Sequence, residues 1–240
     1  KIAMDSMTRV TLELGGKSPT IVMADADLKT AAAGAASAIF FNQGHVCCAG
    51  SRLLVQEGVA DAVIRKLKDR MNSLYIGDPM DKNTDIGAIN SKEQLDLVKK
   101  YIEIGKAEGA EMYQPKCALP KKGYFCAPTL FMDVAQSSRI AQEEIFGPVI
   151  SIMPFDTEEE VLAMANATDY GLAATVWTEH LTRAHRVAGQ LQMGIVWVNC
   201  WLLRDLRTPF GGDKASGVGR EGGWESMRFF TEAKNNYIPY

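Results

Sequence analysis

Two adjacent thiols are the first candidates for chemistry in this sequence. Cys47 and Cys48 lie in the segment Gly44-His45-Val46-Cys47-Cys48-Ala49-Gly50, between an expected helix and a strand expected from Arg52. Backbone N–H groups at such a junction stabilise a thiolate or an oxyanion, so a nucleophilic thiol is a reasonable hypothesis. A cysteine is more often a small buried side chain, and the pair alone therefore identifies no site.

Two carboxylates stand beside glycines. Glu13 lies in an apolar strand segment before Gly15-Gly16-Lys17, where burial raises a carboxyl pKa toward the range of a general base. A strand-end glutamate that faces solvent is an equally good interpretation. Glu144 and Phe146 precede Gly147-Pro148 at the mouth of a loop. The plainer interpretation there is a surface acid beside a core aromatic ring.

A glycine-rich segment follows near the end of the chain. Gly217-x-Gly219-x-x-Gly222 has the spacing of a dinucleotide-binding loop. No strand is expected immediately before it, so we reject that interpretation.

Composition excludes several classes of function. The formal net charge is −3, which leaves no basic surface for nucleic acid or for an anionic membrane. The apolar run Ala31–Phe41 is too short to span a bilayer, which needs about 20 residues. Five cysteines without a C-x-x-C pair and only three histidines supply no metal-binding pattern, so we expect no metal. Such sparse cysteines fit a reducing compartment, and we expect a cytoplasmic protein.

Strand and helix signals alternate along the chain. This alternation predicts an α/β fold with a mostly parallel sheet and helices on its faces. The expected strands are 10–14, 20–23, 52–56, 149–155, 172–178 and 194–199. The expected helices are 28–41, 59–74, 91–109, one beginning at 158, and 181–191.

Four motifs together resemble the NAD(P)-dependent aldehyde dehydrogenase superfamily. They are Glu-Leu-Gly-Gly-Lys-Ser-Pro at 13–19, Phe-Phe-Asn-Gln-Gly-x-x-Cys-x-Ala-Gly-Ser-Arg at 40–52, Glu-x-Phe-Gly-Pro at 144–148, and Pro-Phe-Gly-Gly-x-Lys-x-Ser-Gly-x-Gly-Arg-Glu at 209–221. Their order matches the family, as does the spacing of 34 residues from Glu13 to Cys47. The resemblance implies the catalytic domain of that family, a three-layer α/β domain.

The resemblance implies a role for each matched residue. Cys47 matches the nucleophile that attacks the aldehyde, and Glu13 matches the base that activates water. Glu144 matches the acid that hydrogen-bonds the nicotinamide ribose, and Phe146 matches a side chain near the nicotinamide ring. Gly15 matches the turn that lets backbone approach the cofactor. The implied cofactor is NAD, with NADP left open.

The segment around Arg204 and Arg207 resembles the branch of the family that acts on muconic-type semialdehydes. A guanidinium holds a carboxylate bidentately, which favours an aldehyde that carries a distal acid. Arg207 is the better candidate for this contact. Arg204 pairs with Asp205 in the alternative interpretation, in which only the loop shape matters. Phe210 matches an aromatic wall of the aldehyde pocket.

Two positions depart from the usual pattern of the family. His45 stands where glutamine is common, and a Cys–His dyad is one interpretation of it. We favour a polar residue at the helix end, because side chains two apart rarely face each other. Cys48 is either a packing residue or a resolving thiol under oxidation.

The family's chains are roughly twice as long as this one. We expect residues 1–15 to be a remnant of the cofactor-binding domain, 16–215 the catalytic domain, and 216–240 a return segment and oligomerisation strand. The expected partners are a small aldehyde and, in a homo-oligomer, further copies. We expect no NAD-dependent turnover from these 240 residues by themselves. Two alternatives remain open, a cofactor-free thiol esterase and a non-catalytic segment that pairs subunits.

Overall fold

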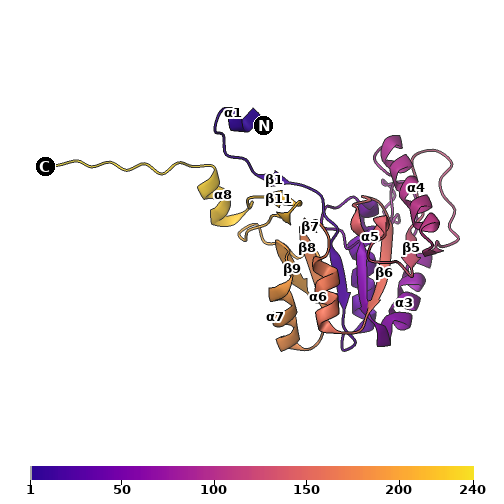
Figure 1. The fold of residues 1–240 in the computed structure, drawn as a ribbon. Coiled ribbons are helices and arrows are strands. Elements are labelled where there is room, and N and C mark those ends of the chain that lie inside the picture. The colour runs from indigo at the N-terminus through magenta and orange to yellow at the C-terminus, as the bar shows by residue number, and fades with distance from the viewer. Residues whose placement is uncertain (1) are drawn as a thin grey trace.

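A seven-stranded sheet organises the chain in the computed structural model, which describes residues 2–240 (Figure 1). The strand order is β4-β5-β6-β3-β2-β8-β9, and all neighbours are parallel except β4, which is antiparallel to β5. The strands of this sheet are β2 (Pro19–Val22), β3 (Arg52–Gln56), β4 (Glu111–Tyr113), β5 (Thr129–Met132), β6 (Val149–Phe155), β8 (Ala173–Trp177) and β9 (Ile195–Val198). The expected α/β class with a mostly parallel, helix-flanked sheet is confirmed.

In the part of the chain that the structure describes, eight α-helices connect and flank the strands. They are α1 (Ile2–Asp5), α2 (Leu28–Phe40), α3 (Ala60–Asn72), α4 (Lys92–Ala107), α5 (Arg139–Gln142), α6 (Glu158–Asn166), α7 (Leu181–Gln190) and α8 (Gly223–Phe229). Two 3₁₀ turns, Phe41–Gly44 and Glu57–Val59, follow α2 and precede α3. Asp27, Ser91 and Thr157 each cap a helix N-terminus with a side-chain oxygen, as their residue types favour.

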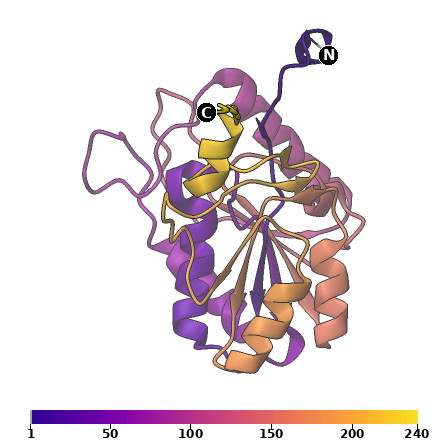
Figure 2. The ribbon, with the colours of Figure 1, turned by 90° about the vertical axis from the view of Figure 1, so that its left-hand side faces the viewer.

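Successive residues of the central strand enter two separate cores. Ile21 packs with residues of α4, α5, α6 and α7, whereas Val22 packs with residues of α2 and α3. Because side chains alternate across a strand, a strand that is apolar at every position serves both faces. Figure 2 shows α2 and α3 on one side of the sheet and α6 on the other.

Two short antiparallel ribbons lie outside the main sheet. β1 (Leu12–Glu13) pairs with β11 (Gly217–Val218), and β7 (Tyr170–Gly171) pairs with β10 (Asp213–Lys214). The expected strand 10–14 is thus only two residues long, because its partner β11 is equally short. The sequence patterns also missed β4 and β5. The residues of β5, Thr-Leu-Phe-Met, form a run of only four residues without alternation. Such a short run does not distinguish a buried strand from a buried segment of helix.

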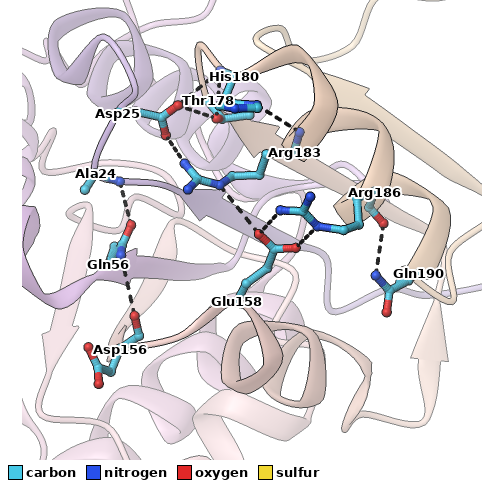
Figure 3. Close-up of polar contacts among 10 residues, drawn as sticks. All are labelled: Ala24, Asp25, Gln56, Asp156, Glu158, Thr178, His180, Arg183, Arg186 and Gln190. Atoms are coloured by element: carbon cyan, nitrogen blue, oxygen red, sulfur yellow. Dashed lines mark hydrogen bonds and ion pairs between the residues drawn. The ribbon is translucent and has the colours of Figure 1, made fainter.

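A network of hydrogen bonds and ion pairs lies at the carboxyl ends of the strands (Figure 3). Asp25, which follows β2, accepts hydrogen bonds from Thr178 Oγ1 at 2.7 Å and from Arg183 Nη1 at 2.8 Å. Glu158 at the start of α6 accepts two hydrogen bonds from Arg186, from Nε at 2.5 Å and from Nη2 at 2.8 Å. These contacts join α6 and α7 to the end of the central strand. Within residues 2–240, no helix is long and apolar enough to cross a membrane.

Candidate active site

Two glycines at the opposite, amino edge of the sheet bring the expected site residues together. The Gly16 N–H donates to Glu144 Oε1 at 3.0 Å. A Cβ on Gly15 would overlap the Glu144 carboxylate, and a Cβ on Gly16 would lie 2.6 Å from the Cys47 carbonyl oxygen. The glycine strap, Gly15–Gly16, therefore touches both Glu144 and Cys47, and only glycine permits these approaches.

The Cys47 thiol is half-buried and has an altered acidity. A hydrogen bond with the Cys48 side chain lowers the pKa of Cys47 to about 7, against the opposing effect of burial. The same hydrogen bond and burial raise the pKa of Cys48, which stays protonated. The indole Nε1 of Trp201 donates to the Cys48 carbonyl at 3.2 Å and holds this peptide. A lowered pKa favours the thiolate, which is the nucleophilic form of a cysteine.

The loop before Cys47 has an uncommon backbone. Asn42, Gln43 and Gly44 all have positive φ, at 50°, 46° and 78°. A Cβ on Gly44 would overlap the Gly147 carbonyl, so glycine is required at this contact. The Asn42 side chain donates to the His45 carbonyl at 3.0 Å, and the His45 N–H donates to the Asn42 carbonyl at 2.9 Å. These bonds fix the turn that presents the thiol.

Glu13 lies in β1 opposite Gly217 of β11 and is exposed. Partial burial raises its pKa, and the nearby Glu221 carboxylate raises it further, while Arg204 and Arg220 oppose the shift. The Glu13 charge in turn raises the pKa of Cys47, which means that the two groups interact electrostatically. A carboxylate with a raised pKa near a thiolate has the property of a general base.

Glu144 lies against the glycine strap, and Phe146 follows it two residues later in the same loop. Burial raises the pKa of Glu144, although the Gly16 N–H and the Lys17 charge act in the other direction. Phe146 is 36% exposed as a residue, and its ring stacks on the His45 imidazole. The His45 ring packs on Phe146 and its Nε2 has no hydrogen-bond partner among the residues described, so the structure shows no Cys–His dyad there.

The two arginines near the C-terminus occupy different environments. The guanidinium of Arg204 lies over the Phe210 ring, 3.9 Å from its centroid, and pairs with Glu221 at 3.1 Å. Phe210 is buried in one cluster with Cys48 and borders Cys47. The Arg207 side chain is 89% exposed and pairs with Asp205. Arg204 therefore lies near the thiols, and Arg207 points to solvent.

Arg52 is a structural residue of the site that the sequence patterns did not single out. Its fully buried guanidinium donates to the carbonyls of Lys17 at 2.8 Å, Met164 at 2.9 Å and Ala165 at 2.8 Å. Burial lowers the pKa of Arg52 to about 10, and the side chain remains cationic. The residue clamps the segment after the glycine strap to the C-terminal end of α6. The sequence offered one sign of this role: Arg52 begins a largely apolar strand, where a charged side chain must find buried partners.

Lys17 is the second buried cation that the sequence patterns missed. Burial lowers its pKa to about 7, and its Nζ has no hydrogen-bond partner among the residues described.

Across the same residues no group of three or more His, Cys, Asp or Glu side chains could hold a metal ion.

A thiol of lowered pKa, two carboxylates of raised pKa and a glycine strap on an α/β sheet are features that covalent thiol catalysis requires. The comparison with known families is more specific. The model of the aldehyde dehydrogenase family matches residues 1–236, and the chain belongs to this family.

Named relatives and solved structures agree with this assignment. The chain is 47% identical to a betaine aldehyde dehydrogenase of Sinorhizobium fredii, over 98% of this chain and 49% of the relative. It is also 47% identical to a 2-aminomuconic semialdehyde dehydrogenase of Danio rerio, over 95% of this chain and 48% of the relative. The chain spans about half the length of these curated relatives.

Two solved structures have the same fold. An indole-3-acetaldehyde dehydrogenase in complex with NAD⁺ superposes with a TM-score of 0.94 at 46% identity, over 99% of this chain and 49% of that chain. An aldehyde dehydrogenase of Bacillus cereus in complex with NAD⁺ superposes with a TM-score of 0.92 at 45% identity, over 96% of this chain and 47% of that chain.

Proposed function

We propose that this chain is the catalytic part of an NAD-dependent dehydrogenase that oxidises an aldehyde to a carboxylic acid. The observation that carries the proposal is the glycine strap, which puts the low-pKa Cys47 in contact with the segment that binds Glu144. The Cys47 thiolate attacks the carbonyl carbon and forms a C–S bond, which gives a thiohemiacetal. When bound, NAD supplies the acceptor for the hydride that leaves this carbon. Glu13 then accepts a proton from the water that attacks the Cys47 thioester, and the thiolate leaves.

The residues present fit a nicotinamide riboside. Glu144 has a carboxylate against the glycine strap, where a side chain on Gly15 would displace it. Phe146, in the same loop, is 36% exposed and stacks on His45. In this proposal Glu144 accepts hydrogen bonds from the ribose hydroxyls and Phe146 packs on the nicotinamide ring. NADP is left open.

We infer that the substrate class is an anionic semialdehyde. The support is Arg204, whose guanidinium covers Phe210 near the two thiols. One relative is named for a semialdehyde of this kind. Arg207 was the favoured candidate from the sequence. Each arginine pairs with a carboxylate, but the Arg207 side chain is 89% exposed and that of Arg204 is 36% exposed over Phe210, so Arg204 is the stronger candidate.

The domain division and the assembly are also proposals. Residues 1–15 belong with a cofactor-binding domain, 16–215 form the catalytic domain, and 216–240 form a return segment and an oligomerisation strand. The extended, exposed chain end supports the last of these (Figure 1). The full activity then requires more chain than these 240 residues, and the assembled enzyme is a homo-oligomer. Five free cysteines support a cytoplasmic location.

Protection of Cys47 by aldehydes tests the proposal. The chain is incubated with 5-oxopentanoate or with neutral pentanal, then with iodoacetamide, and labelling of Cys47 and Cys117 is measured by mass spectrometry. We expect both aldehydes to protect Cys47, with Cys117 as the internal reference, and 5-oxopentanoate to protect at lower concentration. Failure of both to protect Cys47 contradicts the role given to the thiol. NADH formation by the 240 residues contradicts the requirement for more chain.

The same assay separates the two arginines. Arg204→Met is expected to weaken protection by 5-oxopentanoate about 10-fold, the effect of one charge-assisted hydrogen bond in a partly exposed site, while pentanal is unaffected. Arg207→Met is the matched control and is expected to change neither. A larger effect of Arg207→Met would restore the prediction made from the sequence. Hydrolysis of p-nitrophenyl acetate that needs Cys47 but no NAD would favour the thiol esterase.

A further inference from the structure

The imidazole of His45 stacks on the ring of Phe146. The ring centroids are 5.2 Å apart and the planes differ by 8°. His45 lies on the loop that presents Cys47, and Phe146 lies on the loop that carries Glu144. The stack is therefore a side-chain link between the two halves of the candidate site.

Phe146 has a backbone conformation that a bulky residue rarely adopts, with φ of 55°. Such strain persists only where the surroundings hold it, and it is common at functional sites. Two observations identify what holds it. The Gln94 side chain donates to the carbonyls of Ile145 at 3.0 Å and Phe146 at 2.9 Å. The close approach of Gly44 to the Gly147 carbonyl fixes the next residue. The backbone is thus fixed, and His45 fixes the ring.

The His45 side chain makes no compensating polar contact through its inner nitrogen. Its Nε2 is buried and has no hydrogen-bond partner among the residues described. Burial lowers the pKa of His45, so the imidazole that faces Phe146 at neutral pH is uncharged. An uncharged, unpaired imidazole in this place contributes mainly through its flat face, and flat faces of this kind favour offset stacking.

We propose that His45 is a positioning residue for the cofactor: its imidazole supports one face of Phe146 so that the other face receives the nicotinamide ring. The inference rests on the proposed function, which puts the nicotinamide against Phe146. It goes beyond that function because it explains the departure from glutamine at position 45. A glutamine lacks the flat ring and leaves Phe146 free to rotate. Because His45 also lies two residues before Cys47, the stack fixes Phe146 relative to the thiol.

Histidine NMR tests the stack in the chain itself. His45, His180 and His185 are the only histidines, so their ring signals can be assigned by substitution. We expect the His45 ring protons to be shifted upfield by Phe146 and to lose this shift in Phe146→Leu, while the other two histidines keep their signals. Unchanged His45 signals in Phe146→Leu overturn the proposal.

Titration with nicotinamide mononucleotide tests the consequence. This probe carries the nicotinamide ring and its ribose but no adenosine, and NMR measures its weak binding at millimolar concentrations. His45→Gln is expected to weaken binding about 2- to 10-fold, as loss of one stacked pair does, and His45→Phe to restore it. His185→Gln, the same change on the exposed face of α7, is the matched control.

Each outcome of the titration decides the matter. Equal binding by wild type and His45→Gln overturns the inference and leaves the proposed function intact. A wild-type chain that does not respond to the probe also overturns it, because Phe146 then has no nicotinamide to receive. The proposed function is tested independently by aldehyde protection of Cys47.

Discussion

The reactivity of Cys47 depends on its neighbour in the sequence. The hydrogen bond with Cys48 lowers the pKa of Cys47 more than burial raises it. Cys48 can serve as the donor because it is itself buried in an apolar cluster and keeps its proton. At the residue scale, the role we assign to Cys48 is therefore to lower the pKa of Cys47.

Cys48→Ala is expected to raise the pKa of Cys47 from about 7 toward its ordinary value, because the thiolate loses a hydrogen-bond donor. The rate of Cys47 alkylation by iodoacetamide, measured from pH 5 to 10, gives this pKa directly. Cys48→Ser keeps a donor and should restore much of the shift, and Cys126→Ala, at a buried cysteine elsewhere, is the control. If the pH dependence of Cys47 alkylation is the same in Cys48→Ala as in the wild type, Cys48 does not lower the pKa of Cys47.

At the scale of elements, Arg52 joins three segments that are far apart in the sequence. Its donors satisfy carbonyls from the chain between the glycine strap and β2 and from the end of α6. Arg52→Met leaves these carbonyls unpaired in the interior. The expected loss is about 3 kcal/mol or more, which lowers Tm by roughly 6–12 °C in a chain of this size. Thermal unfolding of Arg52→Met beside Arg65→Met, at an exposed arginine of α3, measures it; equal Tm values would contradict the clamp.

The network at the carboxyl edge of the sheet makes stability depend on pH. Hydrogen bonds from Arg186 hold the pKa of Glu158 below its ordinary value of about 4.3. Since the folded pKa is depressed, this carboxylate stabilises the fold above pH 4–5, and the contribution is lost as the pH falls through the folded pKa. Glu158→Gln is expected to lower Tm by roughly 2–5 °C at pH 7.

The difference in Tm between wild type and Glu158→Gln should shrink as the pH is lowered toward 2. Glu159→Gln, one residue along the same helix, is the matched control and should change Tm little at any pH. A constant difference between wild type and Glu158→Gln across this pH range would show that packing, and not charge, explains the loss.

The helices and strands differed in how well the sequence predicted them. The long helices α3 and α4 were predictable because their apolar residues recur at helical spacing and polar residues cover the other face. The strands β4 and β5 and three of the ribbon strands, β7, β10 and β11, were not, because runs of two to four residues carry no clear period. The fourth ribbon strand, β1, lies inside the expected strand 10–14. The contacts of Arg52 could not be predicted either, because its partners are backbone carbonyls, which no pattern of side chains reveals.

Over the whole molecule, the candidate chemistry and the charged network lie at opposite edges of one sheet. Gly16, Cys47 and Glu144 precede β2, β3 and β6, whereas Asp25, Asp156 and Thr178 follow β2, β6 and β8. Ligands of open parallel sheets usually bind at the carboxyl ends of the strands. That rule would have put the site at the wrong edge here. Motifs predicted the candidate site residues, and the contacts of the glycine strap in the folded chain show which of them lie together.

The last residues of the chain are the part of the molecule least tied to the rest. Beyond Phe229 the chain has no helix or strand and runs exposed to Tyr240, with Tyr237 86% exposed and Ile238 77% exposed (Figure 1). Arg9 holds the start of this segment through the Thr231 carbonyl and the Glu232 carboxylate. Residues 233–240 therefore contribute little to folding, and their apolar side chains fit a contact with another copy.

Deletion of residues 233–240 is expected to change Tm by less than about 1 °C, because it removes almost no buried surface. If these residues are the oligomerisation strand, the deletion also shifts the mass measured by light scattering toward the monomer. A Tyr237→Ser/Ile238→Ser variant keeps the length and should give the same shift, which separates side-chain contacts from chain length. A large drop in Tm would mean that the segment packs on its own chain, and an unchanged mass in both variants would assign assembly to another surface.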